Sequence, residues 1–80
     1  MKIEIMGMGC AKCIQLMVNA EKAVKEAGVQ AEVVKVEDIN RIVGYGIMIT
    51  PALVVDGKVI SAGKLLSAEE IGKFIVKKGL

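Results

Sequence analysis

The chain contains no histidine and no tryptophan, and Tyr45 and Phe74 are its only aromatic residues. Without histidine, His-assisted catalysis, His-containing zinc sites and c-type haem attachment are excluded, and Ile14 stands where the haem motif requires His. The scarcity of aromatics argues against nucleic-acid recognition by base stacking. A net charge of +2 provides no basic stripe either. We therefore expect no nucleic-acid partner.

Long apolar runs are also missing. The longest uncharged run lies between Arg41 and Asp56 and is interrupted by two glycines and a proline, so it is too short and too broken to span a membrane. Glu4 interrupts the apolar N-terminal segment, which argues against a signal peptide. The sequence therefore predicts a cytoplasmic protein with no membrane partner.

What the chain does have is a dense aliphatic composition, with 54% hydrophobic residues in 80. A domain of this size buries only about 60% of its unfolded-state surface, so it needs such an interior. We expect one domain over residues 1–80, and a monomer.

Cys10 and Cys13 are the only cysteines, and they form the C-x-x-C motif Cys10-Ala11-Lys12-Cys13. The motif lies between a strand-like run, Lys2 to Met6, and a helical stretch, where unpaired backbone N–H groups and the helix dipole favour a thiolate. Cys10 lies at or before the first helical turn, whereas Cys13 shares an apolar face with Met17 and Ala20. Cys10 should therefore be the more accessible sulfur. In a reducing cytosol a lone C-x-x-C is more often catalytic or metal-binding than structural.

Hydrophobic periodicity and turn signals predict the order β-α-β-α-β-β-α. The expected strands are 2–6, 31–37, 52–55 and 58–60, and the expected helices are 11–27, 39–44 and a last one capped by Ser67 and Glu70. Asp56-Gly57 should form a hairpin turn. We expect a four-stranded sheet with the first strand inside, parallel to the second and antiparallel to the third. In the first helix the buried face should comprise Cys13, Met17, Ala20, Val24 and Ala27.

This order resembles the thioredoxin fold, an α/β fold with a four-stranded mixed sheet flanked by helices. More narrowly, the chain resembles the small thioredoxin-like, redox-active-disulfide proteins of glutaredoxin size. Two motifs carry the resemblance, which covers essentially the whole chain: Gly9-Cys10-Ala11-Lys12-Cys13, and Tyr45-Gly46 through Thr50-Pro51-Ala52-Leu53-Val54-Val55-Asp56-Gly57.

The resemblance implies a thiol–disulfide oxidoreductase without an organic cofactor. Cys10 would attack, Cys13 would resolve the mixed disulfide, Pro51 would be cis beside the pair, and the Thr50 backbone would dock a substrate strand. Its partners would be protein disulfides and a reductase or small-thiol donor.

The chain also departs from the family pattern, because Gly9 and Lys12 replace the aromatic residue and the proline common around the active-site pair. The redox potential of the Cys10–Cys13 pair therefore cannot be inferred from that of a relative. Lys12 would favour the Cys10 thiolate and tune its pKa, or it is an ordinary exposed lysine.

Two alternative functions remain open. Met8-Gly9-Cys10-Ala11-Lys12-Cys13 also matches the M-x-C-x-x-C pattern of heavy-metal-associated domains, which would make the chain a Cu(I) carrier. Those domains have the order β-α-β-β-α-β and end on a strand. The other alternative is a binding module with a vestigial disulfide, which would exchange slowly.

Two polar residues also have open roles. Glu4 could accept a proton near Cys13, although alternation with Ile3 and Ile5 favours a solvent-facing side chain. Tyr45 could contact substrate, although a loop anchor with its hydroxyl in water is the more ordinary role.

Overall fold

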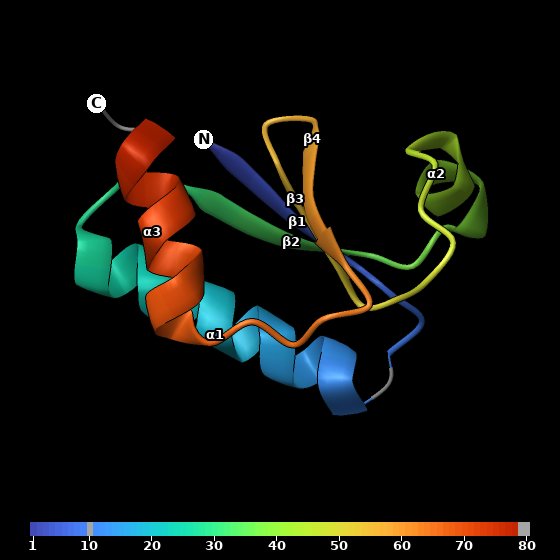
Figure 1. The fold of residues 1–80 in the computed structure, drawn as a ribbon, viewed down its shortest axis with the longest axis horizontal. Coiled ribbons are helices and arrows are strands. Elements are labelled where there is room, and N and C mark those ends of the chain that lie inside the picture. The colour runs from blue at the N-terminus through green and yellow to red at the C-terminus, as the bar shows by residue number, and fades with distance from the viewer. Residues whose placement is uncertain (10, 79–80) are drawn as a thin grey trace.

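The computed structural model describes residues 1–9 and 11–78, without the side chains of 76–78. Its elements follow the predicted order (Figure 1), and they are β1 (Lys2–Met6), α1 (Ala11–Ala27), β2 (Glu32–Val36), α2 (Ile39–Gly44), β3 (Ala52–Val55), β4 (Lys58–Ala62) and α3 (Ala68–Lys78). The second strand is shorter at both ends than predicted, and the fourth is longer. None of the helices in this described part is long and apolar enough to cross a membrane.

The four strands form one mixed sheet in the order β2-β1-β3-β4. The predicted pairing is confirmed, because β1 runs parallel to β2 and antiparallel to β3. Ile3 lies opposite Val33 on one side and Val55 on the other. The strand that leads into the cysteine motif is therefore held on both edges.

Helices α1 and α3 cover one face of the sheet and α2 covers the other (Figure 1). Alternation along β1 sends Ile3 and Ile5 into the larger core with α1 and α3. Met6 packs on the opposite face with Ile42 of α2 and Val54 of β3. Since β3 is buried along its whole length, it contributes to both cores.

The buried face of α1 is rotated from the predicted one. Cys13 and Ala20 are buried as expected, but Leu16 and Ala23 complete the face, while Met17, Val24 and Ala27 are only partly buried. The reason is that α1 packs against both the sheet and α3, so its deepest stripe is the one that meets both.

Local turn and capping signals determine how the elements connect. Asp56 and Gly57 have φ values of 49° and 82°, the left-handed conformations that the predicted two-residue hairpin requires. At the start of α3, the Ser67 N–H donates to Glu70 Oε1 at 3.0 Å and the Glu70 N–H donates to Ser67 Oγ at 3.1 Å. The predicted capping box is therefore confirmed.

Candidate active site

The cysteine motif follows β1 after a three-residue connection, 7–9. Cys13 lies in the first turn of α1 and is 2% exposed, as predicted for the shielded sulfur of the pair. Cys10 lies outside the described residues, so its accessibility stays a prediction. The helix begins without an acidic side chain in its first turn, so no carboxylate there opposes a thiolate at the helix start.

Gly7 lies next to both Cys13 and Thr50. Gly7 is buried, and a Cβ placed on it would overlap Cys13 Sγ and lie 3.9 Å from Thr50 Cβ. The sulfur of Cys13 therefore packs directly against the backbone at the end of β1. Thr50, the residue before Pro51, lies next to the same glycine.

The peptide bond between Thr50 and Pro51 is cis, the conformation that the resemblance implies. Pro51 is buried, and its carbonyl accepts a 2.8 Å hydrogen bond from the Gly63 N–H. Gly63 has φ of 78°, and its Cα packs so closely against Ile49 that a Cβ would lie 2.7 Å from Ile49 Cγ2. Gly63 thus supports the proline loop. Sequence patterns alone do not predict this role, and the one available signal is a glycine directly after the last strand.

Lys12 is exposed on the first turn of α1. A charge in that position is well screened by solvent and salt. Its influence on the Cys10 thiol therefore stays a prediction.

Glu4 is buried, so the expectation of a solvent-facing side chain was wrong. It is 3% exposed, and Arg41 Nη2 lies 2.8 Å from its Oε2, while the Tyr45 hydroxyl donates a 3.0 Å hydrogen bond to its Oε1. The physical reason is that α2 covers this face of the sheet, and that Arg41 of α2 and Tyr45, which directly follows α2, supply the polar partners. The Tyr45 hydroxyl is therefore bonded to Glu4 rather than left to water, and this bond raises the pKa of Tyr45 above 10.0.

The position of Glu4 argues against a proton-acceptor role for it. Because side chains alternate along β1, Glu4 points to the α2 face, whereas Ile5 and Gly7 lie on the face that meets α1 and Cys13. The sheet therefore separates the carboxylate from the Cys13 sulfur. Both carboxylate oxygens are already engaged by α2 and the residue that follows it.

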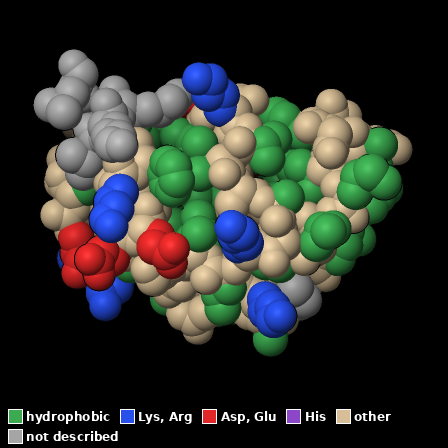
Figure 2. Space-filling model, in the orientation of Figure 1, with side chains coloured by type: hydrophobic (Ala, Val, Ile, Leu, Met, Phe, Trp, Pro, Cys, Tyr) green, Lys and Arg blue, Asp and Glu red, His purple; other side chains and the backbone are tan. Residues whose placement is uncertain are grey.

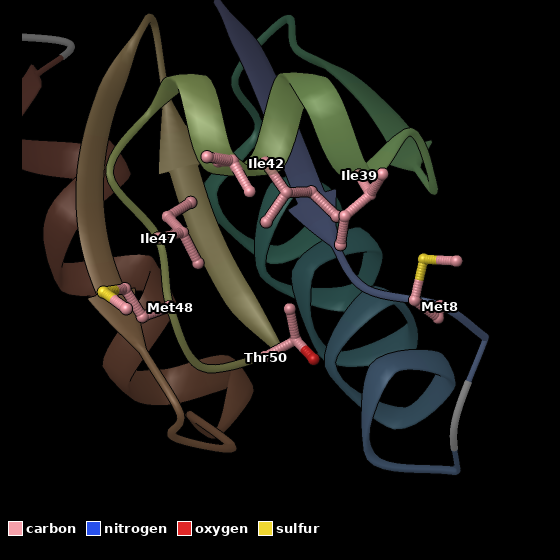
Figure 3. A pocket seen from close by; sticks show the side chains of 7 residues that line it. Met8, Ile39, Ile42, Ile47, Met48 and Thr50 are labelled. Carbon is pink, nitrogen blue, oxygen red and sulfur yellow. The ribbon is translucent and has the colours of Figure 1, made fainter.

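An apolar groove of about 330 Å³ lies beside Thr50. Thr50 is its one polar lining residue, and the others are Met8, Ile39, Ile42, Val43, Ile47 and Met48. In Figure 3, Met8 and Met48 flank the groove on opposite sides below α2. Met48 is 94% exposed, and hydrophobic side chains gather on the surface at this end of the molecule (Figure 2). Sequence patterns could not reveal the groove, because its walls come from three separate segments.

Known proteins similar to this chain show its family. A family model described as "Thioredoxin domain" matches residues 1–76. The chain belongs to the thioredoxin family. It is 44% identical over 75 residues to "Thioredoxin" of Methanothermobacter thermautotrophicus, covering 94% of this chain and 97% of that relative. It is 45% identical over 69 residues to "Thioredoxin" of Methanocaldococcus jannaschii, covering 86% of this chain and 79% of the relative.

A solved structure described as "Structure of a malarial protein" has a similar fold, with a TM-score of 0.70 over 95% of this chain and 93% of that one. At 14% identity this likeness concerns the fold alone. The thioredoxin-like fold expected from the sequence is therefore confirmed.

Family membership also gives the activity class. The protein is a thiol–disulfide oxidoreductase, as the thioredoxin relatives support. The competing metal-carrier order, β-α-β-β-α-β, is not the one found, because α2 separates β2 from β3 and the β3–β4 hairpin leads into α3.

Proposed function

We propose that Cys10 and Cys13 form the redox pair of this protein, with Cys10 as the attacking thiolate and Cys13 as the resolving thiol. The observation that carries this assignment is the burial of Cys13 against Gly7 beside the cis Thr50–Pro51 bond. A shielded sulfur in the first turn of α1 is poorly placed to meet a protein disulfide first. The cysteine that precedes the helix is the better candidate for attack.

The reaction proceeds by two displacements at sulfur. The Cys10 thiolate attacks one sulfur of the substrate disulfide, and the other substrate sulfur leaves as a thiolate. The Cys13 thiolate then attacks the Cys10 sulfur, which releases the second substrate thiolate and forms the Cys10–Cys13 disulfide. Two electrons have passed to the substrate. A reductase or small-thiol donor returns the pair to its dithiol form, and no organic cofactor takes part.

The apolar groove beside Thr50 is the proposed docking region for the protein substrate. Met8 lies two residues before Cys10 in the chain, and Thr50 adjoins Pro51, so the groove connects the two parts of the site. An extended substrate segment can bond to the Thr50 backbone while an apolar side chain next to its disulfide enters the groove. Exposed apolar side chains such as Met48 favour this use because docking removes them from water.

The compartment and the oligomeric state of the protein are proposals as well. A lone C-x-x-C pair suits a reducing cytosol, where its disulfide is transient. We propose the cytoplasm as the compartment and a monomer as the working form.

Equilibration of the protein with glutathione buffers of graded redox potential tests this function. We expect one two-electron transition, between about −270 and −120 mV, at which Cys10 and Cys13 form an intramolecular disulfide. Cys10→Ser and Cys13→Ser should each lose the transition. The rate at which the protein reduces a protein disulfide is the second readout. If this rate is no faster than that of a small thiol, the pair is vestigial and the proposal is overturned.

A further inference from the structure

Gly7 is a glycine for which the backbone conformation gives no reason. Five glycines in the described chain have a positive φ, and Gly7 is not one of them. Its N–H donates a 3.0 Å hydrogen bond to the Val36 carbonyl, continuing the contact between β1 and β2. Since its φ lies outside the left-handed region, most residue types could adopt this backbone conformation. The requirement for glycine must therefore be steric.

The steric reason is the sulfur of Cys13. A Cβ on Gly7 would overlap Cys13 Sγ and lie 3.1 Å from Cys13 Cβ, which is tighter than ordinary van der Waals contact. Since Cys13 is 2% exposed, its side chain has little room to move aside. The space that a side chain at position 7 would fill is occupied by the sulfur.

We infer that Gly7 is a positioning residue for the second displacement, an inference that rests on the proposed roles of Cys10 and Cys13. In that step the Cys13 sulfur forms a bond to Cys10 Sγ while the bond from Cys10 Sγ to the substrate sulfur breaks, and the electron pair leaves on the substrate. The three sulfurs must lie nearly in line. If the Cys13 sulfur has to shift to make room for a methyl group on residue 7, the step becomes slower. The first displacement, by Cys10, does not need Cys13 in place.

Reaction of the reduced protein with one equivalent of dithiobis(nitrobenzoate) separates the two steps. Attack by Cys10 releases one coloured thiolate, and resolution by Cys13 releases the second. In Gly7→Ala we expect the first release to stay within threefold of wild type and the second to slow by roughly tenfold or more. The matched control is Gly72→Ala, since Gly72 also lacks a positive φ and has nothing within 4 Å of an added Cβ. Both releases should be unchanged there. An unchanged second release in Gly7→Ala would overturn the inference.

A stability measurement tests the same contact without using the redox reaction. Gly7→Ala should lower the urea midpoint of the reduced wild-type protein, and by less than half as much in a Cys13→Ala background, where the sulfur is gone. The comparison remains a valid test even if Gly7→Ala alone fails to fold, because the double variant Gly7→Ala/Cys13→Ala should then still fold. Equal losses in both backgrounds would overturn the inference. If the wild type itself releases no second thiolate, the proposed function fails, while the stability comparison still decides whether Gly7 makes room for the sulfur.

Discussion

The hydroxyl of Tyr45 donates a 3.0 Å hydrogen bond to Oε1 of Glu4, a carboxylate that is only 3% exposed in the central strand β1. Arg41 neutralises the other oxygen at 2.8 Å. These two contacts join α2 and the residue after it to the strand that leads into the cysteine motif. They also account for an acidic residue inside a core that is otherwise aliphatic, because a buried charge must be paired and hydrogen-bonded.

Tyr45 should ionise above pH 10.0, because the bond to Glu4 favours its protonated form. It is the only tyrosine and there is no tryptophan, so ultraviolet absorbance reports this one group. We expect Glu4→Gln to bring the titration midpoint back toward 10.0, the ordinary value. A wild-type midpoint at or below that value would contradict the hydrogen bond. Because the folded pKa is raised, the stability linked to Tyr45 is present below pH 10.0 and is lost as pH rises through the folded pKa.

Arg41→Met should lower the free energy of unfolding by about 1–3 kcal/mol, because it leaves a buried carboxylate oxygen without its charged partner. Urea denaturation measures the loss. Lys35→Met is the matched control, since Lys35 forms an exposed pair with Glu37 at 4.0 Å. Exposed pairs contribute about 0–1 kcal/mol, so the control should change little. Equal losses in the two variants would mean that Glu4 does not depend on Arg41.

Some of the features that the sequence predicted correctly are decided by neighbouring residues. The capping box of Ser67 and Glu70 and the hairpin at Asp56 depend on contacts only a few residues apart along the chain. The burial of Glu4 could not be predicted in this way. Its partners lie 37 and 41 residues away, and alternation along β1 says which face Glu4 takes but not what covers that face.

The same distinction holds at the site. The position and burial of Cys13 followed from helical periodicity, but the contact between Gly7 and its sulfur depends on how α1 meets the end of β1. The choice of Leu16 over Met17 as the buried residue likewise depends on where α3 packs. Periodicity alone cannot distinguish two adjacent positions on a helix that contacts two neighbours.

The cap of α3 should make stability depend on acid pH. The Ser67 backbone N–H bonds to the Glu70 carboxylate and holds the pKa of Glu70 below 4.5. A lowered folded pKa gives stability that is present above pH 4.5 and is lost as pH falls through the folded value. Thermal unfolding across this range should therefore show a weaker acid dependence in Glu70→Gln, which keeps an acceptor but does not titrate. An unchanged dependence would exclude Glu70 as a contributor.

Removing the cap residue itself should cost stability at neutral pH. Ser67→Ala deletes the oxygen that accepts the Glu70 N–H and should destabilise the protein by about 1 kcal/mol. Urea denaturation measures this loss.

Met48→Ser should weaken reduction of a protein disulfide while leaving a small disulfide unaffected. Met48 is 94% exposed at the edge of the groove, so the free protein loses little packing when it is replaced. Loss of the apolar contact with substrate should lower kcat/KM by roughly three- to tenfold for a protein substrate. Val59→Ser is the control, since Val59 is an exposed hydrophobic residue outside the groove lining. Equal effects of Met48→Ser on both substrates would contradict docking in the groove.

The most direct test of the account is to trap the mixed disulfide with a protein substrate. Cys13→Ser keeps the attacking sulfur and removes the resolving one, so it should accumulate a stable covalent complex that dithiothreitol releases. Cys10→Ser should form none, because the shielded Cys13 cannot begin the reaction. Complexes should be visible as shifted bands on non-reducing gels. Mass spectrometry should show that the substrate cysteine is joined to Cys10. If Cys10→Ser traps the substrate as well as Cys13→Ser does, or if the bond is found at Cys13, the assigned roles are wrong.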